Sequence, residues 1–296
     1  MKKLFAIIPV LIFAVLLAIY PKEACAAARD GLTLCAVTVI PSLFPFFVVT
    51  ALLLRLGLDS VIRVLCAPFM GPLFRLRGEC AAPLLAGFLG GYPTGARSAA
   101  QLYEQGVLTR EETELLLGFC NNCGIGFLVG FVGAGIFHSV RTGIMLLVVH
   151  IISALLGGVI LCRVVRRKKS VPQLSCQLPV QRVSFPNALT ASVSGALTST
   201  LTVCAYIVFF RVVSALLPES LRGISAAVEM VGAVASLDVN AAGFVAAAGI
   251  TAWGGASVHC QTMAVAGELS LRRHTVGKLL QTVLAVVIAG VMAKWM

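Results

Sequence analysis

Five uncharged and mostly apolar runs constrain the fold more than any other feature of the chain. They cover residues 31–54, 115–140, 142–162, 183–210 and 239–267. Each run reaches the roughly 20 residues that a helix needs to cross a bilayer. Hydrophobic residues make up 59% of the chain and charged residues only 12%, whereas an ordinary soluble domain carries about 25% charged residues. The sequence therefore predicts an all-α polytopic membrane protein and leaves no room for a large soluble domain.

A further apolar run, residues 4–20, follows Lys2 and Lys3. It has two interpretations. One is a secretory signal peptide, with the small residues of "EACAAA" (23–28) as the cleavage region. The other is a retained first helix. A polytopic protein needs no separate signal, and the run is long for the apolar part of a signal peptide, so we expect a retained helix.

The formal net charge is +11, and the positions of the basic residues indicate membrane topology rather than nucleic-acid binding. Lys and Arg residues gather at the ends of the apolar runs, and such groups stay on the cytoplasmic side of a membrane. We therefore place three groups inside: "RVVRRKK" (163–169); Arg55, Arg63, Arg75 and Arg77; and Arg272, Arg273 and Lys278.

Threading the chain with these groups inside gives about seven spanning helices and two short re-entrant hairpins. The segment 80–105 is apolar up to Gly91, broken at 90–95 and polar afterwards, and each arm is too short to span. The segment 223–237 is also short, with Glu229 at its middle. We expect Pro41 and Pro45 to bend the helix at 32–54, the segment 60–78 to lie in the interface, and continuous helices at 115–137 and 239–263.

The two halves of the chain share one pattern. In each, a hairpin is followed by a helix dotted with polar residues, "GFCNNCGIGF" in the first half and "TAWGGASVHCQT" in the second. Opposite orientations of the halves make this an inverted repeat, a design that places a binding site near the membrane midplane. The expected organisation is a first membrane half (1–162), a basic cytoplasmic loop (163–186) and a second membrane half (187–296).

The first hairpin supplies the main group of predicted substrate-binding residues. A half-helix that begins near Thr94, a good N-cap residue, would point free backbone N–H groups at an anion. Arg97 would add a guanidinium that matches a carboxylate in a bidentate manner. The alternatives are glycines that allow close helix packing and an arginine that reaches the interface. The predicted tip residues are Gly90, Gly91, Tyr92, Pro93, Thr94 and Gly95.

Further predicted site residues lie in the polar-dotted helices and the second hairpin. Asn121 and Asn122 lie within an uncharged run, where their amides need partners. Glu229 is an acid at membrane depth, where burial favours its neutral form, and we predict an ion-coupling role. The alternative is an interfacial carboxylate. The second half adds Trp253, Gly255, Ser257 and His259 as substrate-binding residues, whereas His138 and His150 are taken as peripheral.

Neither a metal nor a cofactor is expected. The ten cysteines are scattered through apolar runs and are interpreted as small buried hydrophobes. "CNNC" (120–123) is a single CxxC, which is weak evidence for metal or redox chemistry.

Four motifs, taken in order, resemble one family. "VIPSLFPFFV", "GFLGGYPTGAR", "CNNCG" and "WGGASVHCQ" are similar to those of the YlbJ, or stage V sporulation protein V, family of sporulation integral membrane proteins. The resemblance spans roughly residues 1–270. It implies the nucleoside-recognition or Gate group, an architecture similar to concentrative nucleoside transporters, and movement of dipicolinic acid across the outer forespore membrane of a sporulating bacterium.

Three function classes compete for such a chain. A transporter accounts for the repeat, the broken hairpins and the acid at membrane depth. An intramembrane enzyme lacks support, because neither HExxH nor GxSxG is present. A scaffold would keep its polar residues at surfaces. We therefore expect a non-enzymatic transporter of a small anionic or aromatic metabolite, first dipicolinic acid, with a nucleoside-type transporter or a spore-maturation scaffold as alternatives. The expected partners are the cargo, the bilayer and a second copy of the chain, without nucleic acid.

Overall fold

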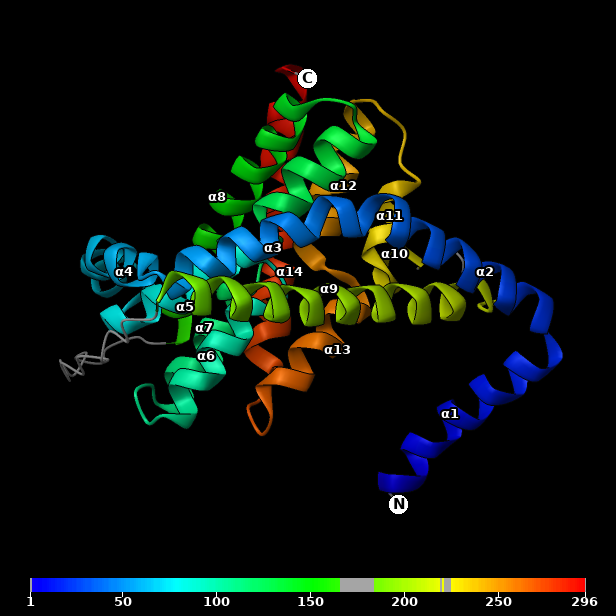
Figure 1. Cartoon of the computed structure of the whole chain (residues 1–296), viewed down its shortest axis with the longest axis horizontal. Coiled ribbons are helices and arrows are strands. Elements are labelled where there is room, and N and C mark those ends of the chain that lie inside the picture. Colours follow the sequence, from blue (N-terminus) through cyan, green and yellow to red (C-terminus); the bar gives the residue numbers. More distant parts are fainter. Residues whose placement is uncertain (1, 166–183, 219, 221–224, 296) are drawn as a thin grey trace.

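The computed structural model describes residues 2–165, 184–218, 220 and 225–295 (Figure 1). These residues form helices and connecting turns, and none of them forms a β-strand. Five helices within the described ranges are long and apolar enough to cross a membrane: Pro21–Arg55, Val140–Val165, Phe185–Ala215, Ala241–Ala266 and Arg272–Trp295. The all-α, multi-pass class is thereby confirmed. The total of seven spans stays a prediction, and most of the predicted basic loop, residues 166–183, lies outside the described residues.

Two consecutive helices make up the chain as far as Arg55. The first, α1 (Lys2–Ile19), projects away from the rest of the molecule (Figure 1). It is followed by α2 (Pro21–Leu34), a π-helical turn (Cys35–Val39) and α3 (Ile40–Arg55), which run on as one helix. The helix continues through Pro41 and Pro45. The π-helical turn directly precedes Pro41, where a proline ring would clash with the carbonyl of a regular α-helix.

The long helices form two groups. The α2–α3 helix packs along α9 (Phe185–Ala215), and the two lie side by side in Figure 1. The second group contains α14 (Arg272–Met292), which packs against both α8 (Val140–Val165) and α12 (Ala241–Trp253). A short 3₁₀ turn, Ala293–Trp295, ends the second group.

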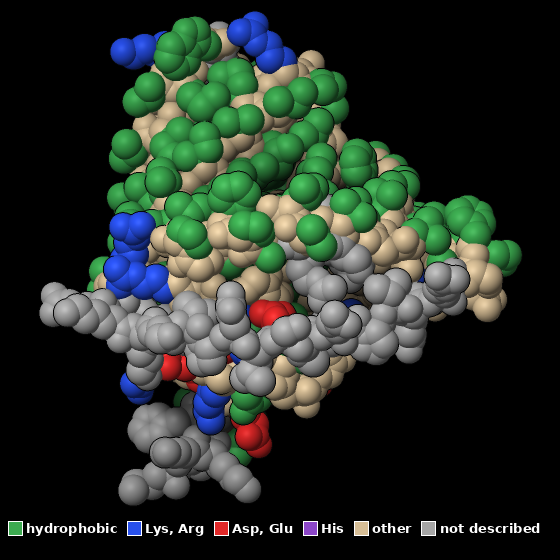
Figure 2. Space-filling view, turned by 90° about the vertical axis from the view of Figure 1, so that its left-hand side faces the viewer, with side chains coloured by type: hydrophobic (Ala, Val, Ile, Leu, Met, Phe, Trp, Pro, Cys, Tyr) green, Lys and Arg blue, Asp and Glu red, His purple; other side chains and the backbone are tan. Residues whose placement is uncertain are grey.

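The outer faces of these helices are apolar. On α8, exposed apolar residues recur every four positions: Ile144, Val148, Ile152, Leu156 and Ile160. Figure 2 shows hydrophobic side chains over the upper part of one face, with Lys and Arg at its upper end and charged residues again in its lower half. A continuous apolar stripe on the outside of a helix is typical of contact with lipid.

The other described helices are shorter. In chain order they are α4 (Leu58–Phe69), α5 (Ala81–Gly90), α6 (Thr94–Glu104), α7 (Arg110–Cys120), a π-helix (Gly126–Ile136), α10 (Ser225–Val228), α11 (Met230–Ala235) and α13 (Gly255–Ala266). The helix expected at 115–137 is interrupted at Asn121–Gly124. The helix expected at 239–263 agrees with the candidate span Ala241–Ala266, but it is broken locally at Gly254, which adopts the left-handed conformation (φ 85°) that glycine tolerates.

The hairpin of α5 and α6 packs closely against the C-terminal end of α7. A Cβ atom added to Gly87 would lie 1.7 Å from the Cys120 carbonyl oxygen, and one added to Gly95 would lie 2.0 Å from the same atom. Any side chain at either glycine would therefore displace the last carbonyl of α7. Two glycines of the "GFLGGYPTGAR" motif are thus explained by close backbone packing between the hairpin and α7.

A buried ion pair closes the base of this hairpin. Arg77 lies just before α5, and its Nε and Nη2 donate to Glu112 Oε1 and Oε2 at 3.0 and 2.8 Å. Arg77 Nη2 also donates to the Val107 carbonyl, in the connection between α6 and α7. Glu112 completes a capping box with Thr109 at the start of α7. The side chains of Arg77 and Glu112 are only 7% and 2% exposed.

The hydrogen bonds that Glu112 accepts determine the direction of its pKa shift. Burial by itself would raise the pKa of this carboxyl, but the hydrogen bonds from Arg77 and Thr109 outweigh burial and lower it. A carboxyl whose pKa is lowered on folding stabilises the protein above its unfolded pKa, and this contribution is lost as the pH falls through the folded pKa.

Replacing Glu112 by Gln should therefore destabilise the protein at neutral pH, because it leaves the Arg77 guanidinium buried without its counter-charge. Breaking a buried pair by removing one partner typically costs about 3–5 kcal/mol. The measurement is thermal unfolding of the detergent-solubilised protein. The double variant Arg77→Met/Glu112→Leu should recover part of the loss. An unchanged melting temperature for Glu112→Gln would show that the pair does not hold the hairpin base.

Candidate functional site

Four interruptions of helices meet near the centre of the molecule. The first is Gly91–Pro93 between α5 and α6, which contains a cis Tyr92–Pro93 peptide bond, and the second is Asn121–Gly124 after α7. The third is Glu229, which is extended between α10 and α11, and the fourth is Gly254 between α12 and α13. Each half of the chain therefore contributes one interrupted short segment and one interrupted longer helix.

Within each half, the two interruptions pack on one another. A Cβ added to Gly91 would lie 2.9 Å from the Gly124 nitrogen, so the first two breaks are in backbone contact. In the second half, a Cβ added to Gly255 would lie 3.1 Å from the Val228 carbonyl and 3.2 Å from the Met230 nitrogen, on either side of Glu229. The same kind of contact is thus made twice, by unrelated residues.

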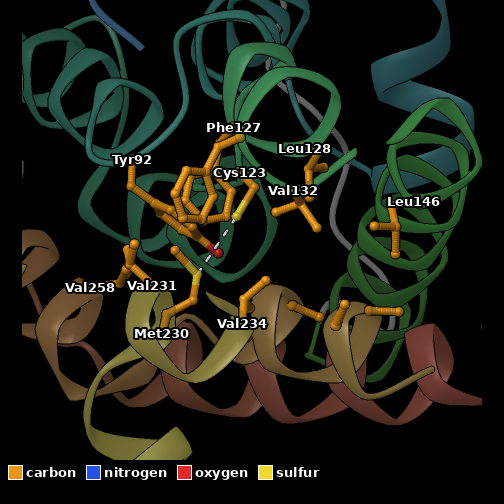
Figure 3. Close-up of a cluster of buried hydrophobic side chains, with 14 of the residues drawn as sticks. Tyr92, Cys123, Phe127, Leu128, Val132, Leu146, Met230, Val231, Val234 and Val258 are labelled. Carbon is orange, nitrogen blue, oxygen red and sulfur yellow. Dashed lines mark hydrogen bonds between the residues drawn. The ribbon is translucent and has the colours of Figure 1, made fainter. Parts of the chain in front are cut away.

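Side chains then connect the two halves. Tyr92 donates through its hydroxyl to the Thr251 carbonyl at 3.2 Å, and Asn121 Nδ2 donates to Thr262 Oγ1 at 2.7 Å. The sulfur atoms of Cys123 and Met230 lie 3.9 Å apart. Figure 3 shows this contact, with Tyr92, Cys123 and Phe127 of the first half on one side and Met230, Val231 and Val258 of the second half on the other.

A small central cavity lies where the halves meet. Its volume is about 40 Å³, room for a few water molecules at roughly 10–15 Å³ each. Its wall is mostly apolar, and Ser257 and Gln261 add polar groups. The aromatic lining residues are Phe46, Phe47, Tyr92, Phe127 and Tyr206. At this volume the cavity does not hold a molecule the size of an aromatic ring.

A larger, basic cavity of about 390 Å³ lies next to the central one, and Phe47 lines both. It is bounded by α3, the hairpin α5–α6 and α9. Its polar lining is Thr50, Arg55, Thr94, Arg97, Ser98 and Gln101, together with Ser199 of α9. Two guanidinium groups and several hydroxyls, with no carboxylate among the described lining residues, favour an anion in this cavity.

A third cavity, of about 540 Å³, begins next to the centre on the side of the second half. Glu229 is part of its lining, and the next residue, Met230, lines the central cavity. Its other charged lining residues are Glu23, Asp30 and Arg211. The mixed charges distinguish this cavity from the basic one.

The predicted residues of the first hairpin are divided between two cavities. Gly91 and Tyr92 line the central cavity, and Gly90, Thr94 and Arg97 line the basic cavity. Thr94 is the first residue of α6 rather than its N-cap, and its Oγ1 lies 3.4 Å from the Gly90 carbonyl. Arg97 is exposed in the first turn of α6. Gly95 contacts α7, and Pro93 is buried in the turn.

Among the other predicted residues, several are occupied by internal contacts. Asn122 Nδ2 donates to the Phe119 carbonyl, and its Oδ1 accepts from Gln281. The His259 ring lies between those of Trp253 and His274, tilted against the first and edge-on to the second, with centroids 4.5 and 5.0 Å away. Ser257 lines the central cavity. Two buried side-chain oxygens, Asn121 Oδ1 and Gln261 Oε1, lack a hydrogen-bond partner among the described residues.

Glu229 caps α11. Its carboxylate oxygens accept from the Val231 and Gly232 N–H groups at 2.6 and 2.5 Å. A carboxylate at a helix N-terminus is stabilised by the free N–H groups and the helix dipole. The carboxylate therefore has a local structural role, and its predicted ion-coupling role stays a proposal.

Two residues at the centre were not among the site residues predicted from the sequence. Lys278 was assigned to a cytoplasmic basic group with Arg272 and Arg273, but its side chain is fully buried in α14. His150 was taken as peripheral, but its Nε2 accepts from the Cys123 N–H at 3.1 Å. A signal for Lys278 was available, because His274, Lys278 and Gln281 share one face of an otherwise apolar helix at i, i+4 and i+7.

The contacts of the two adjacent asparagines predict different effects of their replacement. Asn122→Ala removes two hydrogen bonds, so the Phe119 carbonyl loses its side-chain donor and Gln281 Nε2 loses one of its two contacts. Asn121→Ala removes one bond, to a hydroxyl that also donates to the Val258 carbonyl. Each buried group left unpaired costs about 1–3 kcal/mol, so Asn122→Ala should lower the melting temperature more. Equal or reversed effects would contradict the assigned contacts.

Comparisons with known proteins agree with the resemblance described above. A family model described as Gate, nucleoside recognition, matches residues 36–137, the part that contains the first hairpin and the first interrupted helix. The sporulation integral membrane protein YlbJ of Bacillus subtilis (strain 168) is 31% identical over 214 residues, which cover 67% of this chain and 52% of the relative. The chain thus spans about half the length of that curated relative.

No solved structure matches the chain. The family assignment therefore depends on the sequence, on the order of its motifs and on the apolar helices that carry them. Together these findings show that the chain is a multi-pass membrane protein of the YlbJ family with a Gate, or nucleoside-recognition, domain.

Proposed function

We propose that the protein transports a small anionic or aromatic metabolite by alternating access. The observation that carries this proposal is the meeting of four interrupted helices at one cavity between two larger ones. Interrupted helices at membrane depth are found where backbone lines a cavity or a substrate path. The small volume of the central cavity fits a closed intermediate, in which access from both larger cavities is blocked.

The two large cavities are proposed as the vestibules on the two sides of the membrane. Under this proposal the hairpin α5–α6 enters from the cytoplasm, α10–α11 enters from outside, and the halves form an inverted repeat similar to that of concentrative nucleoside transporters. The repeated contact between breaks, Gly91 on Gly124 and Gly255 beside Met230, supports the proposal. The proposal also includes about seven membrane-spanning helices, with the segments 80–105 and 223–237 as re-entrant hairpins.

Dipicolinic acid is the first cargo proposed. It is a planar aromatic ring with two carboxylates, and it would use both features of the site: Arg55 and Arg97 for the carboxylates, and the aromatic wall for the ring. The name of the Bacillus subtilis relative connects that protein with sporulation, and the outer forespore membrane is the proposed location. A nucleoside is the second candidate, because the matching family model is described as nucleoside recognition.

The inverted arrangement can be tested by labelling from each side of the membrane. In a background without reactive cysteines, Gln105→Cys at the base of the first hairpin should react with a membrane-impermeant thiol reagent from the cytoplasm. Ser236→Cys at the end of the second should react only from outside. Both positions are exposed in the structure. Labelling of both from one side would remove the inverted repeat.

The basic cavity predicts a charge-selective effect of Arg97. Arg97→Gln should weaken binding of dipicolinate, and roughly fivefold is expected because Arg97 is exposed and its ion pair is screened by water. Arg97→Lys should fall between the wild type and Gln, because it keeps the charge but loses the planar fork. Binding of uridine, a neutral ligand, should not change.

The measurement for Arg97 is competition against labelled dipicolinate uptake in proteoliposomes. Arg141→Gln is the matched control, since Arg141 is also exposed but lies outside the three cavities. If the Arg97→Gln variant bound dipicolinate with wild-type affinity, Arg97 would be an interfacial residue and would not belong to the binding site. Wild-type protein that moves neither dipicolinate nor uridine would contradict the transport proposal itself.

A further inference from the structure

Lys278 is a cation buried at the junction of the two halves. Its Nζ donates to the Tyr92 hydroxyl at 3.1 Å and to Gln281 Oε1 at 2.8 Å, and it lies 5.0 Å from the centroid of the Tyr92 ring. The side chain has no exposed surface. Tyr92, in turn, lines the central cavity. A buried cation therefore lies directly behind the tip of the first hairpin.

No carboxylate balances this amine within the described part of the chain. The side-chain ion pairs found there are Arg77–Glu112 and Arg110–Glu114, both away from Lys278. The titratable groups that face Lys278 come from the hairpin tip, from α7 and the break after it, from α8, from α13 and from α14 itself. They are Tyr92, Cys120, Cys123, His150, His259 and His274. An ammonium buried without an anion is strongly unfavourable.

The hydrogen bonds around Nζ suit an amine with two protons. Two acceptors, Tyr92 Oη and Gln281 Oε1, contact it, and no third acceptor lies within hydrogen-bond distance among the described residues. A neutral amine has two N–H donors, whereas an ammonium has three. A third proton would be left without a partner in the closed conformation.

Both acceptors belong to contacts that keep the halves closed. The Tyr92 hydroxyl donates its own proton to the Thr251 carbonyl of the second half. Gln281 Nε2 donates to Asn122 Oδ1 at 3.2 Å and lies 3.2 Å from His150 Nε2, which also accepts from the Cys123 N–H. The amine thus contacts the first hairpin directly and the interrupted segment after α7 through Gln281.

We propose that Lys278 is the proton-carrying group of the transport cycle. In the closed conformation its amine is neutral and holds Tyr92. When the hairpin tip moves away and water reaches Nζ, the amine takes a proton from that side, and the ammonium then disfavours closing unless an anionic cargo enters with it or the proton leaves again. A proton that enters together with an anionic cargo is carried through the closed conformation and released with the cargo on the other side, so uptake of the anion is coupled to the proton gradient. This inference rests on the proposed transport function and moves the coupling role from Glu229 to Lys278.

The first test does not need the cargo. Hydrogen–deuterium exchange of the segment Gly91–Gly95 is followed in detergent at several pH values, after correction for the intrinsic pH dependence of amide exchange. In the wild type, protection of the segment should be lost as the pH falls. Lys278→Met should abolish this pH dependence, and Lys294→Met, at an exposed lysine near the end of the chain, should leave it unchanged. A pH-independent wild type, or a pH response that survives in Lys278→Met, would overturn the inference.

The second test uses proteoliposomes with labelled dipicolinate, an anion, as the probe. The wild type should show uptake stimulated by a pH gradient, and Lys278→Met should lose the stimulation while retaining counterflow exchange at equal pH. Lys278→Gln is the second neutral variant if Met does not fold. If Glu229→Gln loses the stimulation and the Lys278 variants keep it, Glu229 is the coupling group and the inference is wrong. Absence of any wild-type transport would defeat the proposed function, and the exchange experiment would still decide on Lys278.

Discussion

The interruption of helices inside a buried core is the constraint on which the rest of the structure depends. At each break, backbone N–H and C=O groups lose their helical partners, and neither hydrocarbon nor an apolar core can replace them. The chain meets this requirement by bringing the breaks together. Gly91 lies on Gly124, Gly255 lies against the chain on either side of Glu229, and the Glu229 carboxylate accepts from the exposed N–H groups of α11.

The polar side chains at the centre follow from the same requirement. Asn121 and Tyr92 bond across the boundary between the halves, and Asn122 bonds both to the end of α7 and to Gln281 of α14. Of these residues, Tyr92 also lines the central cavity, whose volume is about 40 Å³. Because these bonds link the two halves beside the cavity, a motion that separates the halves there must break and remake them. The groups that stabilise the fold are therefore those on which the proposed gating depends.

The burial and the neighbours of three basic residues determine their different roles. Arg97 lines a large cavity and is exposed, so it can meet an incoming anion but contributes little to stability. Arg77 is paired and buried, so it serves to hold the base of the hairpin. Lys278 is buried with no carboxylate beside it among the residues that the structure describes, a condition that is tolerated only while the amine is neutral or an anion is near. Three basic residues thus have three different physical roles.

The sequence by itself determined the class of protein, because runs of about 20 apolar residues have few outcomes other than membrane helices. It also located the backbone breaks at Gly91–Pro93 and marked Asn121, Asn122 and Gly255 as unusual, since glycine and amide groups are costly in apolar helices. Only the tertiary structure decided which breaks face one another, that Gly87 and Gly95 hold the Cys120 carbonyl, and that Lys278 and His150 belong to the centre. Those facts depend on contacts between residues in different helices, from Gly95 with Cys120 to Tyr92 with Lys278, and no local pattern of residues encodes such a pairing.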